Sequence, residues 1–244
     1  MKRSSAAQAR SRCAGFTLVE LSMVLVVVAL IIGAVTAGMD LQRNATYQRI
    51  SATFVRGWQM AFISHAERTG RVPGDTASPA SGKVRKGTGE LCGLDLRNAM
   101  YAAGVRMPQG RAEGSETHYG YLDSNGNPQD LEVCMRYVKW LVPGSSAGQY
   151  VVQQRNVLVL KRMTPDLARL IDSLIDGTPD AQFGGFREAA VAGGPSDQAV
   201  GYVFTTVASR DWSLDARYGY SGAPANRDEQ QVAVVTGYYL MDPE

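Results

Sequence analysis

The apolar residues of this chain are concentrated in one unbroken run near the N-terminus. Between Phe16 and Met39 the only ionisable side chain is that of Glu20, and the other polar groups are three hydroxyls. A helix of about 20 apolar residues is enough to cross the hydrocarbon core of a membrane. Four basic residues and no acidic one precede the run, which predicts a cytoplasmic N-terminus and an exported body.

After the apolar run, the hydrophobic positions become periodic. They recur at helical spacing among polar residues, at Leu41, Ala45, Ile50, Phe54, Trp58, Phe62 and Ile63. This spacing predicts an amphipathic helix with one apolar face. Gly70 and the Val72-Pro73-Gly74 run are stop signals, so we expect the helix to end near Thr69. A helix of some 50 residues would be roughly 80 Å long, and its second half must therefore pack against something other than lipid.

The remainder of the chain predicts a mixed fold. Residues 70–89 are rich in Gly, Pro, Ser and Thr, which indicates a long loop. Helices are expected at 90–103 and 164–175, the second with Thr164 as N-cap and Pro165 at its first position. β-Branched and aromatic residues predict strands at 133–141, 150–160, 200–208 and 231–240. The expected fold class is α+β, with an antiparallel sheet packed on the long helix.

The junction between the basic leader and the apolar run is unlike that of an ordinary secretory signal, where the small-residue cleavage site follows the apolar core. Here Gly15 precedes it, so a cut after Gly15 leaves the helix on the mature chain. The stretch Gly15-Phe16-Thr17-Leu18-Val19-Glu20-Leu21 resembles the class III signal of type IV pilins and of the pseudopilins of type II secretion. The resemblance implies that prepilin peptidase cuts after Gly15 and methylates the amine of Phe16.

Glu20 is the candidate assembly residue. A carboxylate within hydrocarbon is costly and is treated as functional, with a partner to be found. Cleavage would create the nearest cation, the α-amine of Phe16, one helical turn away. Glu20 can pair with the amine of its own chain or, in a staggered bundle, with that of a neighbouring subunit, and the resemblance favours the neighbour. The alternative is a glutamate that snorkels or stays protonated in a plain signal anchor.

The resemblance also implies a domain organisation and a role. We expect a cleaved leader (1–15), a transmembrane and assembly helix (16–39), its amphipathic continuation (40–69) and an exported globular pilin-like domain (70–244). The expected role is a structural subunit of a type IV pilus-like filament, a minor one because the chain is longer than most major pilins. Its expected partners are other pilin or pseudopilin subunits, prepilin peptidase and the inner-membrane assembly platform. Its expected location is the bacterial inner membrane, single-pass with a periplasmic C-terminal domain, and then the filament.

Two other roles stay open. A pseudopilin of a type II secretion system carries the same signal, and the lack of proline between Phe16 and Val72 favours a pseudopilin or minor pilin over major pilins with a kinking proline. A signal-anchored periplasmic enzyme has less support. The two histidines, His65 and His118, lie in no motif, and Asp172 with Asp176 could pair as acid and base but are explained by capping. We therefore expect no catalytic residues.

Net charge argues against nucleic acid as a partner. The chain has 25 basic and 23 acidic residues. Removing the four leader cations leaves 21 against 23, a net charge of −2, and non-specific nucleic-acid binding depends on clustered cations. A local basic cluster at Lys83, Arg85 and Lys86 is interpreted as a solvated loop.

Topology separates the three cysteines. Cys13 lies in the leader and would leave with it, whereas Cys92 and Cys134 lie on the exported side, where disulfides persist. We expect one bridge between these two. Major pilins often place their disulfide near the C-terminus, so the central position of this pair puts transfer of their receptor-binding loop in doubt.

The segment Asp123-Ser124-Asn125-Gly126-Asn127-Pro128-Gln129-Asp130 is the candidate metal site. Calcium prefers clustered oxygen ligands in a tight loop, and Asp123, Asn125, Asn127 and Asp130 could supply four. The segment departs from the EF-hand pattern, because Pro128 stands where Gly is required and Cys134 where a bidentate Glu belongs. The alternative is a hairpin turn, for which Asn-Gly is the strongest short signal. No other cofactor is expected.

Two short motifs resemble stretches of a subset of prepilin-like proteins. They are Val72-Pro73-Gly74-Asp75 and the segment 170–179, Leu-Ile-Asp-Ser-Leu-Ile-Asp-Gly-Thr-Pro. They support membership of the same family but do not indicate a specific function.

Overall fold

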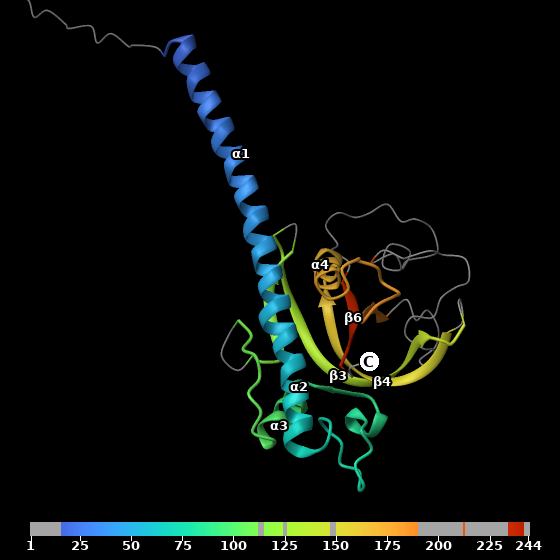
Figure 1. Cartoon of the computed structure of the whole chain (residues 1–244). Helices are drawn as coiled ribbons and strands as arrows, with labels where there is room; N and C mark the ends of the chain where they lie inside the picture. Colours follow the sequence, from blue (N-terminus) through green and yellow to red (C-terminus); the bar gives the residue numbers. More distant parts are fainter. Residues whose placement is uncertain are drawn as a thin grey trace, which may run out of the picture. The chain divides into compact units, whose positions relative to one another are not determined.

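The computed structural model describes residues 16–111, 115–123, 126–146, 150–189, 212 and 234–241. The chain divides into two units, Met1–Gln42 and Arg43–Glu244, which are described separately. Its long helix begins in the first unit as α1 (Leu18–Arg49) and continues in the second as the π-helix η1 (Ile50–Val55) and as α2 (Arg56–Thr69) (Figure 1). Gly70 ends the helix in the left-handed conformation, with φ 66°, which glycine adopts without steric cost. The predicted end near Thr69 is confirmed.

The second unit contains one antiparallel sheet. Its order is β1-β3-β4-β6-β5, and β2 also pairs with β3. β1 and β2 follow each other along one edge of β3, whose other edge pairs with β4 from Glu132 to Pro143. Figure 1 shows β3 and β4 as a long curved hairpin. The strands are β1 (Glu90–Cys92), β2 (His118–Leu122), β3 (Pro128–Pro143), β4 (Tyr150–Met163), β5 (Phe186–Glu188) and β6 (Val235–Leu240).

Apolar side chains pack on both faces of this sheet, because successive residues of a strand point to opposite faces and the adjacent residues 133–135 and 157–160 are all buried. On one face, Val133 and Leu160 join the larger core with buried residues of the long helix, Phe54 and Trp58 among them. On the opposite face, Cys134 and Val159 belong to a smaller cluster with Trp140 and Tyr238. The predicted α+β fold, a long helix packed on an antiparallel sheet, is confirmed.

Three shorter helical segments complete the described fold: η2 (Val84–Gly87), α3 (Gly93–Ala102) and α4 (Pro165–Ile175). Helix α4 starts as predicted, because the Thr164 side chain accepts a hydrogen bond from the N–H of Leu167 and Pro165 occupies the first turn. The hydroxyl thereby satisfies one of the amides that the first turn leaves without a helical partner.

Some boundaries differ from the sequence prediction. The expected helix at 90–103 is wrong at its start, because Glu90–Cys92 pairs with β3 and the helix begins only at Gly93. The expected strands at 133–141 and 150–160 are longer in the structure, and the last strand is observed as β6, Val235–Leu240. The expected strand at 200–208 lies outside the described residues.

Candidate assembly helix and associated sites

The first unit offers an apolar helix surface that nothing in the unit covers. The side chains described along α1 as far as Leu41 are exposed, and Phe16 is 81% exposed. By length and composition the helix can cross a membrane, with a mean hydropathy of 2.8 in its most apolar window, none of which is buried. Exposed apolar surfaces of this size are typical of segments that contact lipid or other chains.

The Thr17 and Glu20 side chains form a capping box at the start of this helix. The Thr17 N–H and its hydroxyl both donate to Glu20 Oε2, at 2.9 and 2.8 Å, and the Glu20 N–H donates to Thr17 Oγ1 at 3.2 Å. This reciprocal arrangement satisfies helix-terminal amides that have no intrahelical partner. The sequence analysis missed it, although the spacing Thr-x-x-Glu before an apolar run is its recognised signal. Gly15 lies outside the described residues.

Glu20 therefore caps its own helix even without a partner chain. Both Thr17 bonds end on Oε2, and among the described residues no bond is recorded to Oε1. One carboxylate can thus cap its own helix through one oxygen and receive a cation through the other. Whether that cation belongs to a neighbouring chain remains a prediction.

In the second unit, the same long helix turns one face towards the sheet. Tyr47, Ile50, Phe54 and Trp58 are almost fully buried. The Tyr47 hydroxyl donates to the carbonyl of Leu122 at 3.3 Å, at the end of β2. The segment Ile50–Val55 has π-helical hydrogen bonding, and such bulges often occur at functional positions.

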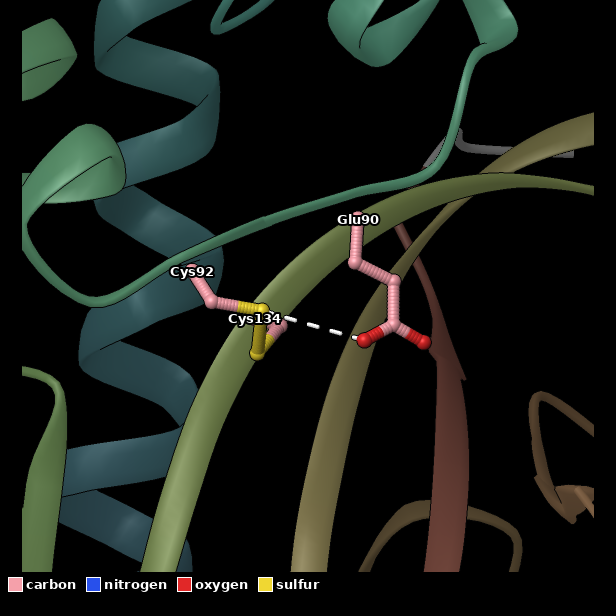
Figure 2. Close-up of side chains that lie close together, drawn as sticks. All are labelled: Glu90, Cys92 and Cys134. Carbon is pink, nitrogen blue, oxygen red and sulfur yellow. Dashed lines mark hydrogen bonds between the residues drawn. A yellow bond between two sulfur atoms is a disulfide. The ribbon is translucent and has the colours of Figure 1, made fainter.

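Cys92 and Cys134 form a disulfide between directly opposed residues of β1 and β3, with Cα atoms 4.4 Å apart. Figure 2 shows the Glu90 side chain beside the sulfurs. Its Oε2 lies 3.8 Å from Cys92 Sγ. This contact is not a true hydrogen bond, because a disulfide sulfur carries no proton to donate. Although two sulfurs and a carboxylate lie close together, the bridged sulfurs are not thiolates and therefore lack the form that binds metals. The Glu90 carboxylate pairs instead with Lys161 and Arg136.

The candidate calcium loop lies at the turn between β2 and β3. The Asp123 carboxylate accepts bonds from the N–H of Asn127 at 2.8 Å and from Gln129 Nε2 at 3.0 Å. Gly126 adopts a left-handed φ of 81°, as the hairpin alternative requires. Asp130 bonds elsewhere, to His118 Nδ1 at 3.0 Å and Arg162 at 2.8 Å. Asn125 lies outside the described residues, and calcium binding stays a prediction.

Both histidines have hydrogen-bond partners among the described residues. His65 is buried, and its Nδ1 lies 3.0 Å from the carbonyl oxygen of Arg71 where the long helix ends. His118 pairs with Asp130 on the exposed side of the β2–β3 hairpin. That pairing was not evident from the sequence, because the two residues are brought together only by the pairing of β2 with β3.

In the motif at 170–179, two aspartates at the C-terminal end of α4 bind backbone N–H groups of the loop that follows the helix. Asp172 is fully buried, and its Oδ2 accepts bonds from the N–H of Asp180 and the indole of Trp212, both at 2.7 Å. The two oxygens of Asp176 accept bonds from the N–H groups of Gly185 and Phe186, each at 3.0 Å. Burial raises the pKa of Asp172 to about 8; the Trp212 bond opposes this shift and the neighbouring Asp176 adds to it.

The motif at 72–75 acts in the same way in the loop after the long helix. The buried Asp75 carboxylate accepts bonds from the N–H groups of Ala77, Ser81 and Gly82. Burial would raise the pKa of Asp75, but these bonds outweigh it and lower the pKa. Both aspartate motifs therefore hold loops, and their geometry is that of structural capping groups.

Comparison with protein families identifies the N-terminal signature. Residues 10–36 match the family model of the prokaryotic N-terminal methylation motif. This is the signature of type IV pilins and pseudopilins, and its presence at the N-terminus confirms the resemblance identified in the sequence. Neither the comparison with curated proteins nor that with solved structures gives a match.

Proposed function

We propose that this protein is a minor subunit of a type IV pilus-like filament. The matched signature, followed by an exposed apolar helix, is the observation that carries the proposal. Prepilin peptidase removes residues 1–15, and the chain is held in the inner membrane with its second unit in the periplasm. Assembly then transfers the apolar helix surface from lipid to a bundle of neighbouring helices.

Glu20 would guide this transfer. In a bundle that excludes water, a carboxylate without a cation is costly. The methylated amine of Phe16 in an adjacent subunit would offer the compensating charge. The capping box supports this role, because it holds the carboxylate at the helix start while leaving Oε1 for a partner.

A pseudopilin of a type II secretion system is the second candidate. The long helix runs from Leu18 to Thr69 without a proline, which favours pseudopilins and minor pilins alike. The two roles share processing and helix packing, and they differ in the machine that the filament serves. Genes adjacent to this one, from a pilus operon or a secretion operon, would separate them.

The test of the proposal is the mature N-terminus. Intact mass and N-terminal sequencing of membrane-extracted protein should show a chain that begins at methylated Phe16. Gly15→Leu should trap the precursor, whereas the matched change Ala14→Leu should allow some processing because it leaves the cleaved bond in place. A leader still attached in cells with active prepilin peptidase would contradict the proposal.

A further inference from the structure

The segment Lys83–Gly87 is a fixed part of the sheet surface. Val84 is fully buried, and its N–H donates to the Asn156 side chain at 3.0 Å. The Asn156 amide in turn donates to the carbonyl of Gly82 at 3.0 Å, and the Asp75 carboxylate binds the preceding turn. The basic cluster at this position is therefore held in place, which the interpretation as a solvated loop did not anticipate.

Two cationic residues of this segment have strained backbones. Arg85 and Lys86 have φ angles of 47° and 58°, in the left-handed region that residues with a side chain seldom occupy. Glycine would fit both positions without steric cost. Strain of this kind persists only where the surroundings enforce it, and it is concentrated at functional sites. The exposed Lys86 side chain is thus displayed at the expense of stability, whereas Arg85 Nη1 donates to the carbonyl of Glu90 at 2.7 Å.

The surrounding sequence concentrates positive charge. Residues 76–89 contain three basic and no acidic residues, and residues 133–165 contain five basic and no acidic residues. Glu90 pairs with Arg136 and Lys161, and Asp130 pairs with Arg162. Arg85 Nη1 also lies 3.8 Å from Asp95 Oδ2, and the mature chain as a whole is net negative.

The loop adjoins an exposed face of the β3–β4 hairpin. Lys83 Nζ lies 5.3 Å from the ring centre of Tyr137. Lys139 follows two positions later and therefore projects from the same side of β3. The register continues this side through the β4 residues Gln154, Val152 and Tyr150, all exposed. We call this surface, together with the exposed Lys86 of the adjoining loop, the cationic face; its other residues are Lys83, Lys139, Gln154, Val152 and Tyr150.

We propose that the cationic face docks an acidic polypeptide segment that also carries apolar side chains. Its cations supply charge complementarity, which favours encounter and excludes like-charged partners. Its exposed valine and tyrosine supply the apolar and aromatic contacts found in protein interfaces. A nucleic-acid surface would be more uniformly positive. This binding role goes beyond assembly through the N-terminal helix and does not depend on it.

Fluorescence anisotropy with the detergent-solubilised full chain tests the proposal. The probe is a labelled 12-residue peptide of alternating Glu and Val, compared with a Gln–Val peptide of the same length. We expect saturable binding of the acidic peptide that weakens as salt rises. The variant K86E/K139E should weaken it about tenfold or more. The matched variant R106E/R111E makes the same charge change at exposed sites outside the cationic face and should leave it unchanged.

Lys86→Gly separates binding from folding. It removes one cation and relieves the left-handed strain. It should therefore raise the melting temperature of the chain while weakening the binding of the acidic peptide. Absence of saturable binding, or equal loss in the two charge-reversal variants, would overturn the proposal. Tighter binding of single-stranded DNA or of phosphatidylglycerol vesicles would replace the peptide by those partners. Because no test requires filaments, failure here leaves the proposed assembly function standing, and the reverse also holds.

Discussion

At the scale of single residues, carboxylates do different work according to where the fold places them. Glu20 caps an exposed apolar helix, and Asp75 and Asp176 each bind backbone amides of a loop. Asp172 is fully buried beside another carboxylate and keeps its proton to an unusually high pH. The chemistry of each group follows from its hydrogen-bond donors and its access to water.

Glu20 permits its two roles to be separated by substitution. Glu20→Gln keeps the capping box, which accepts Glu or Gln, but removes the charge. Glu20→Ala removes both. If the charge binds a neighbour's amine, both variants should insert normally yet enter filaments about tenfold less, since a bond to a charged group contributes about 1.5–3 kcal/mol. Immunoblots of sheared filaments measure this. Wild-type incorporation of the Gln variant would instead restrict Glu20 to capping.

Asp172 should give the folding stability a distinct pH dependence. Its pKa is about 8 in the folded chain and about 3.9 when unfolded. Between these values the folded state retains a proton that the unfolded state releases. Its contribution is therefore fully present below about pH 4 and is lost as the pH rises through 8.

Asp172→Asn mimics the protonated acid and should remove that dependence. Relative to wild type, its melting temperature in detergent should rise as the pH is raised from 5 to 9. Asp176→Asn is the control, because it weakens the bonds to Gly185 and Phe186 and should destabilise the chain at every pH. A difference between Asp172→Asn and wild type that does not change with pH would exclude the buried acid as its cause.

At the scale of elements, the long helix and the β3–β4 hairpin were predictable because each repeats one pattern over many residues. The start of β1 was not, because three residues carry no usable period and Glu90–Cys92 acquires its strand form from β3. The same holds for β2 and β5. The Thr17–Glu20 cap is encoded in the sequence as Thr-x-x-Glu before an apolar run, but the same glutamate is also a charge in an apolar helix, and that feature conceals the capping signal. The His118–Asp130 contact required the register of two strands.

The disulfide joins two of these elements, and we expect it in the mature protein. Non-reducing peptide mapping of membrane-extracted protein should find Cys92 linked to Cys134. The variant C92S/C134S should unfold more easily by about 3–4 kcal/mol in the chain-entropy description of a loop of this length. A reductant should lower the melting temperature of the wild type and leave that variant unaffected. Two free thiols in periplasmically matured protein would contradict this expectation.

The β2–β3 turn is either a calcium site or a plain hairpin turn, and the effect of calcium on stability distinguishes the two. If Asp123, Asn125, Asn127 and Asp130 bind it, calcium at a hundredfold excess over Kd stabilises the fold by about 2.7 kcal/mol. A chelator should then lower the melting temperature, and Asp123→Ala should abolish the response. If the Asp123 bonds to Asn127 and Gln129 are only turn contacts, calcium and chelator will have no effect. Calorimetric titration at millimolar calcium decides between them.

At the scale of the whole molecule, the two units have opposite relations to solvent. Residues up to Gln42 expose an apolar helix, whereas the unit from Arg43 buries large aromatic side chains such as Trp58, Trp140 and Tyr121 around its own sheet. The proposed filament role requires this difference. The first unit must move from lipid to a bundle of neighbouring helices, while the second unit keeps its fold.

A truncation series tests that independence. A chain that starts at Arg43 should be soluble without detergent and melt as cooperatively as the full chain, because Tyr47 and the rest of the core are retained. A chain that starts at Ser51 loses Tyr47 and Ile50, which are 1% and 0% exposed. It also loses the contact of Tyr47 with Tyr121, whose ring centre is 5.8 Å away. Since a fully buried large apolar side chain contributes about 1.5–3 kcal/mol, the shorter chain should be less stable by several kcal/mol in urea unfolding. Equal stability of the two chains would mean that the helix segment before Ser51 is not part of the folded unit, and aggregation of the chain from Arg43 would mean that the unit needs its membrane helix to fold.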